Sequence, residues 1–313
     1  MLDKILIPVD GSPRAEAVLR PIARLLRRRE SHFVFLRVLE SSLAYPGVET
    51  LPVVESDRAE AKAYFRELMA RLTVENARVS GLIREGYPAD VILHVAKEEK
   101  ATMIAMSTHG RTGPARWAWG SVADKVLRGS EVPVLLTRSY RSEGAGWIPA
   151  PPEEAPFSRL LVPTDGTEAA AAILPFATMI ARDFGAEVAG VHVVSDRAER
   201  VIGHTRVPRP SPDQARRVAE EFVVRLADEG LKTRAFGAAG DPAEKILEAA
   251  AAYGADLIAM CTRGRSGLAR LRLGSVTERV LRGASIPMLV VRASRDAATS
   301  ARPRGLSRAD ASS

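Results

Sequence analysis

Short apolar runs alternate with longer amphipathic segments along this chain. In its first half, the runs expected to be strands cover residues 4–9, 33–38, 77–84, 101–106 and 132–137. Between them, apolar residues recur every three or four positions, which predicts helices that begin at Ser12 and that cover about 57–73, 88–99 and 121–128. Uninterrupted apolar strands alternating with helices are typical of a parallel sheet covered on both faces.

The same pattern of apolar runs and amphipathic segments recurs in the second half of the chain, at an offset of 154–155 residues. Residues 4–12 correspond to 159–167, and residues 101–106 correspond to 255–260. A constant offset over this length indicates a duplicated domain rather than a short solenoid repeat. We therefore expect an α/β fold made of two tandem open parallel five-stranded sheets with helices on both faces, Rossmann-like in architecture.

The expected boundaries follow from changes in composition. They are a first domain over 1–141, a Pro-, Gly- and Glu-rich linker over 142–157, a second domain over 158–293 and a disordered tail over 294–313.

Composition and charge narrow the class of protein. The 313 residues carry a net charge of +7 and contain one cysteine, Cys261, so no disulfide can form within the chain. The basic residues are spread over both halves, and the densest cluster, Arg27–Arg29, follows an amphipathic segment, which favours a solvated surface over a nucleic-acid interface. No apolar run approaches the ~20 residues that span a bilayer. We expect a cytoplasmic protein with neither nucleic acid nor membrane as partner.

A glycine-containing loop follows the fourth expected strand of each copy. In the first copy, nine residues separate Ser107-Thr108-His109-Gly110 from Gly120-Ser121. In the second copy, nine residues separate Cys261-Thr262-Arg263-Gly264 from Gly274-Ser275. Glycine lets a ligand approach the backbone closely, and the N–H groups at a helix N-terminus suit a phosphate. Parallel sheets bind ligands at the carboxyl ends of their strands, where Asp10 and Asp165 also lie. The chain therefore predicts two anion-binding sites.

Taken singly, these residues have simpler interpretations. Asp10 suits a turn, and Ser121 suits the N-cap of an ordinary helix. Gly129 and Gly283 are expected to be helix C-caps, and Cys261 a small residue at a tight turn rather than a nucleophile.

Together, the motifs resemble the universal stress protein family in its tandem form, over nearly all of 1–140 and 158–293. The family signature is Gly, two residues, Gly, nine residues, then Gly-Ser or Gly-Thr. Both copies keep the last three elements and depart at the first glycine, which is Ser107 in one copy and Cys261 in the other. The resemblance implies an adenine-nucleotide-hydrolase-like fold that binds ATP, with or without Mg²⁺.

The resemblance also assigns positions. It implies Asp10 and Asp165 near the ribose and phosphates, and Val38 and Val193 holding the adenine through main-chain groups. The full candidate set is Pro8, Asp10, Val38, Ser107, Gly110, Arg111, Gly120, Ser121 and Val122 in the first copy, and Pro163, Asp165, Val193, Cys261, Gly264, Arg265, Gly274, Ser275 and Val276 in the second. It further implies that the copies pair within the chain through their last strands, 132–137 and 286–291, and allows a homodimer.

Three functions stay open on the sequence. The first is an ATP-binding stress protein that regulates unidentified protein partners, without dedicated catalytic residues or metal ligands. The second is a nucleotide-free dimerising module of the same family, which the Ser107 and Cys261 departures favour. The third is an enzyme of the same sheet architecture, such as an adenylating ligase or a flavoprotein. Such enzymes usually add a substrate domain or a flavin-binding segment, whereas the second half of this chain is a second copy of the first.

Overall fold

The structure is a computed structural model of the whole chain. It describes residues 3–19, 21–22, 31–40, 55–72, 77–108, 120–138, 157–195, 201–202, 205–206, 211–262 and 273–293. The predicted tail, nearly all of the predicted linker, the Arg27–Arg29 cluster and four site candidates, Gly110, Arg111, Gly264 and Arg265, lie outside the described residues.

The first copy follows the predicted alternation of strands and helices. Its elements are β1 (Lys4–Pro8), the 3₁₀ helix η1 (Ala15–Val18), β2 (Ser31–Leu39), α2 (Glu55–Arg71), β3 (Ala77–Glu85), α3 (Pro88–Glu98), β4 (Met103–Ser107), α4 (Ser121–Gly129) and β5 (Val134–Thr137).

The second copy repeats this order and adds a small hairpin. Its elements are β6 (Arg159–Thr164), the 3₁₀ helix η2 (Glu168–Ile173), α5 (Leu174–Phe184), β7 (Glu187–Val194), the hairpin β8 (Val201–Ile202) and β9 (Thr205–Arg206), α6 (Pro212–Ala227), β10 (Thr233–Ala239), α7 (Pro242–Tyr253), β11 (Leu257–Thr262), α8 (Ser275–Gly283) and β12 (Met288–Arg292).

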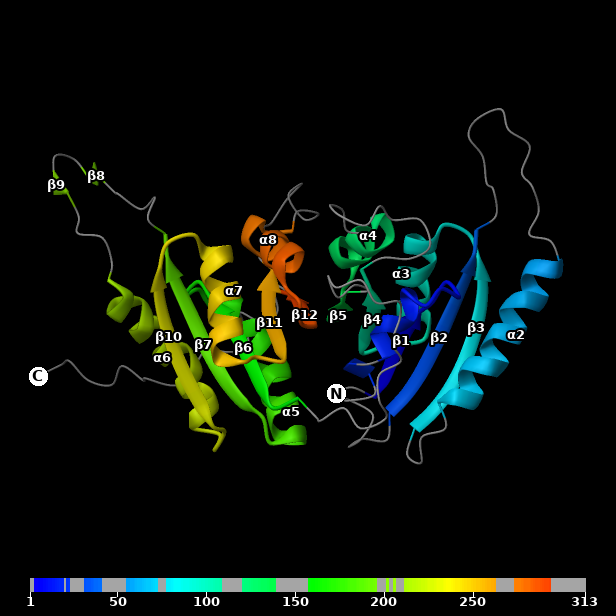
Figure 1. Ribbon diagram of the computed structural model, residues 1–313, viewed down its shortest axis with the longest axis horizontal. Coiled ribbons are helices and arrows are strands. Elements are labelled where there is room, and N and C mark those ends of the chain that lie inside the picture. Colours follow the sequence, from blue (N-terminus) through cyan, green and yellow to red (C-terminus); the bar gives the residue numbers. More distant parts are fainter. Residues whose placement is uncertain are drawn as a thin grey trace, which may run out of the picture.

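The two five-stranded sheets join into one sheet of ten strands, in the order β10-β7-β6-β11-β12-β5-β4-β1-β2-β3 (Figure 1). Within the five strands that each copy contributes to this sheet, all pairs are parallel, whereas β12 and β5 pair antiparallel, with Leu289 opposite Leu135. The copies thus meet through their last strands, as the resemblance implies. The two predicted five-stranded sheets are continuous, because the edge hydrogen-bonding groups of β5 and β12 satisfy one another.

The core forms one layer on each face of this sheet. Alternate residues of β1 point to opposite faces, so Ile5 and Ile7 pack in the layer under η1, α2, α5 and α6, and Leu6 packs in the layer under α3, α4, α7 and α8. Both layers run across the junction: Leu135 and Leu289 belong to the first, and Val134 and Val290 to the second. Each of these four side chains is at most 2% exposed. The copies therefore share their core.

Two expected helix features differ from the structure. The segment after Ser12 opens as the 3₁₀ helix η1, and the rest of the predicted helix lies largely outside the described residues. Gly129 and Gly283 are the last residues of α4 and α8 rather than C-caps. A Cβ atom on Gly129 would lie 2.5 Å from Leu93 Cδ1, and one on Gly283 would lie 2.2 Å from Leu247 Cδ1. Each glycine therefore makes room for the end of a leucine side chain of the neighbouring helix, and a larger residue would require that leucine to shift.

Across the described residues, no helix combines the length and the apolar character that crossing a membrane requires.

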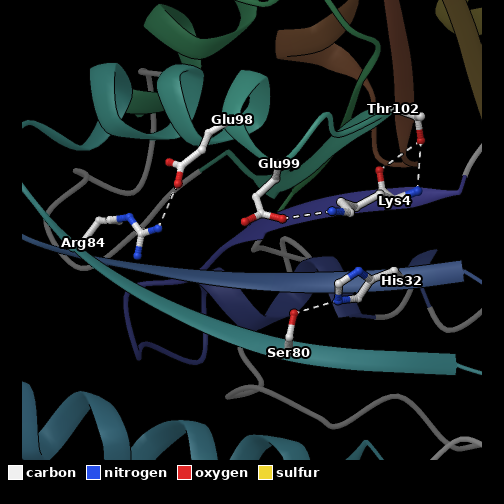
Figure 2. Close-up of polar contacts among 7 residues, drawn as sticks. All are labelled: Lys4, His32, Ser80, Arg84, Glu98, Glu99 and Thr102. Atoms are coloured by element: carbon white, nitrogen blue, oxygen red, sulfur yellow. Dashed lines mark hydrogen bonds and ion pairs between the residues drawn. The ribbon is translucent and has the colours of Figure 1, made fainter.

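Polar contacts fasten the amino-terminal edge of the first sheet (Figure 2). Lys4 donates from Nζ to Glu99 Oε2 at 2.9 Å, and the Thr102 hydroxyl donates to the Lys4 carbonyl at 2.9 Å. On the neighbouring strands, His32 Nε2 and Ser80 Oγ share a hydrogen bond of 2.7 Å. These contacts lie at the edge opposite the predicted site, so we assign them to stability.

The second copy fastens the same edge with other residues. Asp256 takes the place of Thr102 and accepts a hydrogen bond from the Arg159 backbone N–H at 3.2 Å. Glu187 and Arg234 take the places of His32 and Ser80, and Arg234 Nε donates to Glu187 Oε1 at 2.6 Å. The hydrogen bond from Arg234 holds the pKa of Glu187 below its ordinary value. The two copies therefore place side-chain contacts at the same positions of this edge but make them with different residues.

His32 gives this edge a pH dependence. Burial, and then the positive charges of Lys4 and Arg78, lower the pKa of His32 below its ordinary value. As pH falls below ~6.5, the unfolded chain therefore takes up a proton at His32 before the folded chain does, and the free energy of unfolding decreases. We expect His32→Gln, which keeps a hydrogen-bonding group for Ser80, to flatten this decrease between about pH 7 and pH 5. Urea unfolding at several pH values measures it, and an unchanged slope contradicts it.

Candidate functional site

Asp10 and Asp165 stand in matching turns at the ends of β1 and β6. Asp10 Oδ1 accepts from the Ser12 N–H at 2.9 Å and from its hydroxyl at 2.5 Å. Asp165 Oδ1 accepts from Thr167 in the same way, at 3.0 Å and 2.5 Å. The simple turn interpretation is thus correct for one oxygen of each carboxylate. The turn also fixes where each carboxylate stands at the strand end.

The two Gly-Ser pairs open α4 and α8. Gly120 and Gly274 are the N-cap residues, and Ser121 and Ser275 occupy the first helical positions. The alternative that made Ser121 the N-cap is therefore wrong. Since glycine has no side chain, neither N-cap residue can satisfy the first N–H groups of its helix, as serine or aspartate would. The Gly120 N–H itself donates to the Thr108 carbonyl at 2.7 Å, which ties the helix start to the end of β4.

A cavity of about 810 Å³ opens at the carboxyl edge of the second copy. All seven described candidates of that copy line it. They are Pro163, Asp165, Val193, Cys261, Gly274, Ser275 and Val276. The cavity lies between the ends of β6 and β11, which are neighbours in the sheet, and the start of α8. This is the point where the strand order of the copy reverses, the usual ligand crevice of an open α/β sheet.

Sequence reasoning missed part of the lining. The further lining residues are Arg128, Thr164, Ala169, Ala170, Val191, Pro242, Ile246, Met260, Leu273, Thr277 and Glu278. Pro242 belongs to a Gly-x-Pro-Ala motif that recurs at residues 86–89 and 240–243, and that repetition was an available signal. Arg128 comes from the first copy, and nothing in the repeat points to it.

The first copy sets its candidates at the corresponding places. Pro8 ends β1, Val38 lies near the end of β2, Ser107 ends β4, and Gly120 precedes α4, which starts with Ser121 and Val122. Ser107 is buried, like the Thr108 that follows it. The loop between Thr108 and Gly120 lies outside the described residues.

Cys261 faces the second-copy cavity as an unreactive thiol. Burial, and then the negative charge of Asp165, raise the pKa of Cys261 to about 12. At neutral pH the group is therefore a thiol, and its thiolate, the nucleophilic form, is suppressed. Cys261 lies within strand β11 and pairs with Val291 of β12, so its expected place in a tight turn is wrong. The influence of Asp165 on its pKa places Cys261 within electrostatic reach of that carboxylate.

We expect Cys261 to react slowly with a thiol reagent such as an aromatic disulfide at pH 7–8. The rate should keep rising with pH towards about 12, because only the thiolate attacks. The unfolded chain in urea should react at the rate of an ordinary thiol. A folded-state rate that levels off near pH ~8.5, the ordinary cysteine pKa, contradicts this environment.

A second, smaller cavity of about 520 Å³ lies over β7, β10 and α7. Its charged side chains pair with one another: Glu187 with Arg234, and Lys245 Nζ with Glu248 Oε2 at 2.6 Å. None of the predicted candidates lines it. We therefore take the larger cavity as the candidate functional site. Among the described residues, no group of three or more His, Cys, Asp or Glu side chains is placed to hold a metal ion.

Fold and cavity together define the class: a doubly wound α/β protein with its ligand crevice at the carboxyl edge of the sheet. The universal stress protein family model matches residues 1–138 and again residues 156–292. The chain therefore belongs to the universal stress protein family, in tandem form.

Individual relatives agree. A universal stress protein of Methanocaldococcus jannaschii is 33% identical over 147 residues, covering 44% of this chain and 82% of its own. A universal stress protein of Mycobacterium bovis is 25% identical over 307 residues, covering 93% of this chain and 97% of its own. The crystal structure of a universal stress protein from Archaeoglobus fulgidus superposes with a TM-score of 0.67 at 21% identity, over 95% of this chain and 98% of that one. The similarity to the Archaeoglobus fulgidus structure shows the fold alone.

Proposed function

We propose that this universal stress protein binds ATP at the carboxyl edge of its sheet and acts by regulation rather than catalysis. The observation that carries the proposal is the second-copy cavity, which gathers all seven described candidates of that copy around one space. Its volume of about 810 Å³ lies within the ~300–1,000 Å³ typical of small-molecule sites.

The cavity offers suitable chemistry for each part of a nucleotide. The N–H groups at the start of α8, behind Gly274, suit the phosphates, and the Ser275 hydroxyl adds a donor. The Asp165 carboxylate suits the ribose hydroxyls or a phosphate-bound Mg²⁺. The apolar walls at Val193, Ile246 and Met260 suit a flat base. We propose the same roles for the corresponding residues of the first copy.

The regulatory part of the proposal rests on the chemistry of the lining. Cys261, the one cysteine of the chain, is held as a neutral thiol, which does not suit a nucleophile. The carboxylate of Asp165 already accepts two hydrogen bonds from Thr167 in its turn. We therefore propose that ATP binding changes the contacts of this protein with partner proteins, and that the site is not dedicated to turning over ATP.

Calorimetric titration of the full chain with ATP, with and without Mg²⁺, tests the proposal. We expect binding below millimolar concentration, with up to two sites for each chain. The absence of any heat or thermal stabilisation at millimolar ATP would falsify ATP binding.

The second candidate function is a nucleotide-free interaction module. The loss of the first signature glycine, to Ser107 and Cys261, favours it, because a side chain now stands where the family has none. Release of nucleotide from the denatured purified protein, detected by ultraviolet absorbance, separates the two candidates. Under the first candidate an adenine spectrum is released, and under the second it is absent.

A further inference from the structure

The second-copy cavity is not built by the second copy alone. Of the described residues that line it, Arg128 alone belongs to the first copy. Arg128 lies in the last turn of α4, and Figure 1 shows α4 and α8 facing one another across the middle of the molecule, above β5 and β12. A cationic side chain from one copy therefore reaches the ligand space of the other.

The antiparallel junction explains how Arg128 arrives there. Val134, at the start of β5, pairs with Val290, in the middle of β12, and the two strands run antiparallel. The chain just before β5 therefore lies beside the carboxyl end of β12, the edge of the second sheet at which the cavity opens. Arg292, the last residue of β12, fixes this arrangement by donating from Nη1 to the Arg128 carbonyl at 3.2 Å.

Arg128 and Glu278 both line the cavity, and their opposite charges interact there. Its Nε donates to Asp124 Oδ2 at 2.8 Å, which raises the pKa of Arg128, and the negative charge of Glu278 raises that pKa further. Glu278 lies in the first turn of α8, close to the N–H groups that suit phosphate. Arg128 therefore stands at the phosphate end of the cavity rather than at the apolar end formed by Val193 and Ile246.

A carboxylate at that end would repel a phosphate unless it is compensated. Arg282 Nη2 contacts Glu278 Oε1 at 2.5 Å from within α8, and Arg128 adds a second positive charge from α4. A guanidinium has five N–H donors in a planar fork, and this shape matches the oxygens of a phosphate.

We propose that Arg128 of the first copy completes the phosphate-binding end of the nucleotide site of the second copy. The inference rests on the proposed function and adds a consequence to it. Because the site is assembled from both copies, nucleotide bound in the second copy stabilises the junction between β5 and β12. The two halves of the chain are thereby coupled through a ligand and not through the sheet alone.

The test uses the full chain carrying Gly120→Val, which silences the first-copy site and leaves a single site to titrate. ATP and adenosine are titrated by calorimetry into this parent, then into the parent with Arg128→Gln. We expect the glutamine variant to bind ATP about tenfold more weakly and adenosine nearly unchanged, because a charge-assisted hydrogen bond to phosphate is lost. Arg128→Lys, which keeps the charge, should recover part of the ATP affinity.

Arg216→Gln is the matched control. It removes an arginine that pairs with an acidic residue four positions later, Glu220, at 2.9 Å on α6, away from the cavity. It should leave both titrations unchanged. Equal loss of ATP and adenosine affinity on Arg128→Gln, or no loss of either, overturns the inference. A parent that binds no ATP overturns the proposed function itself, and the inference with it.

Discussion

Replacing Gly274 by valine is expected to abolish ATP binding in the second copy and leave the chain folded. Gly274 has φ −62° and ψ 140°, a conformation that valine adopts readily. Among the residues that the structure describes, a Cβ atom there would meet only Thr277 Oγ1, at 3.8 Å, so they leave room for it. The added methyl groups instead occupy the cavity in front of the N–H groups of α8. We expect the affinity of this site to fall about a hundredfold or more, a loss of ~2.7 kcal/mol.

Calorimetry and thermal unfolding measure these two expectations separately. The number of ATP molecules bound for each chain should fall by one, while the unfolding temperature without nucleotide stays within about 2 °C of the parent. Gly274→Ala serves as a graded control with an intermediate loss of affinity. Unchanged stoichiometry and affinity in the valine variant would mean that the phosphates bind elsewhere, and would contradict the phosphate-binding role of Gly274 and the start of α8.

Replacing Gly237 by alanine should instead damage the fold. Gly237 lies on β10, where α6 packs so closely that a Cβ atom would lie 2.0 Å from the Pro212 carbonyl oxygen and 2.3 Å from the Arg216 nitrogen. Both are backbone atoms, so no side-chain rotation relieves the overlap and the whole helix must move away. We expect a loss of about 3 kcal/mol, or an unfolding temperature lower by roughly 6–12 °C.

Gly81 on β3 provides the matched comparison. A Cβ atom there would lie 2.9 Å from Met69 Cε and 2.9 Å from Phe65 Cδ2, which are side-chain atoms and can move without displacing the backbone. Gly81→Ala should therefore cost less than half as much as Gly237→Ala in urea unfolding. If the two alanine variants prove equally stable, α6 does not pack on β10 as closely as the structure places it.

Much of this fold was predictable from its patterns. Strand 77–84 and helix 88–99 were expected within a residue of β3 and α3, because the spacing of apolar residues and the order of elements within the repeat report local structure directly. The second-copy site was predictable for a related reason. In a parallel sheet, the carboxyl ends of strands share one edge, so the candidates at Asp165, Cys261 and Gly274 had to converge.

The features that were missed depend on contacts between distant elements. Gly129 looks like a C-cap in the sequence, and its role is visible only once α3 packs on α4 and Leu93 approaches it. Arg128 could not be assigned to the second-copy cavity, because its position depends on the register in which β5 meets β12. No local pattern encodes the register between two domains.

The junction of β5 and β12 also bears on how the two copies change over evolutionary time. In an assembly of identical subunits, every substitution appears on both sides of the symmetry axis at once. Here each side is encoded separately, and corresponding positions carry different residues. His32 bonds with Ser80 in the first copy, and Glu187 bonds with Arg234 at the same places in the second. Because the two halves belong to one chain, each is at high effective concentration relative to the other, and their pairing withstands dilution while each half accumulates its own substitutions. The fusion thus turns a symmetric architecture into one whose two halves are free to specialise.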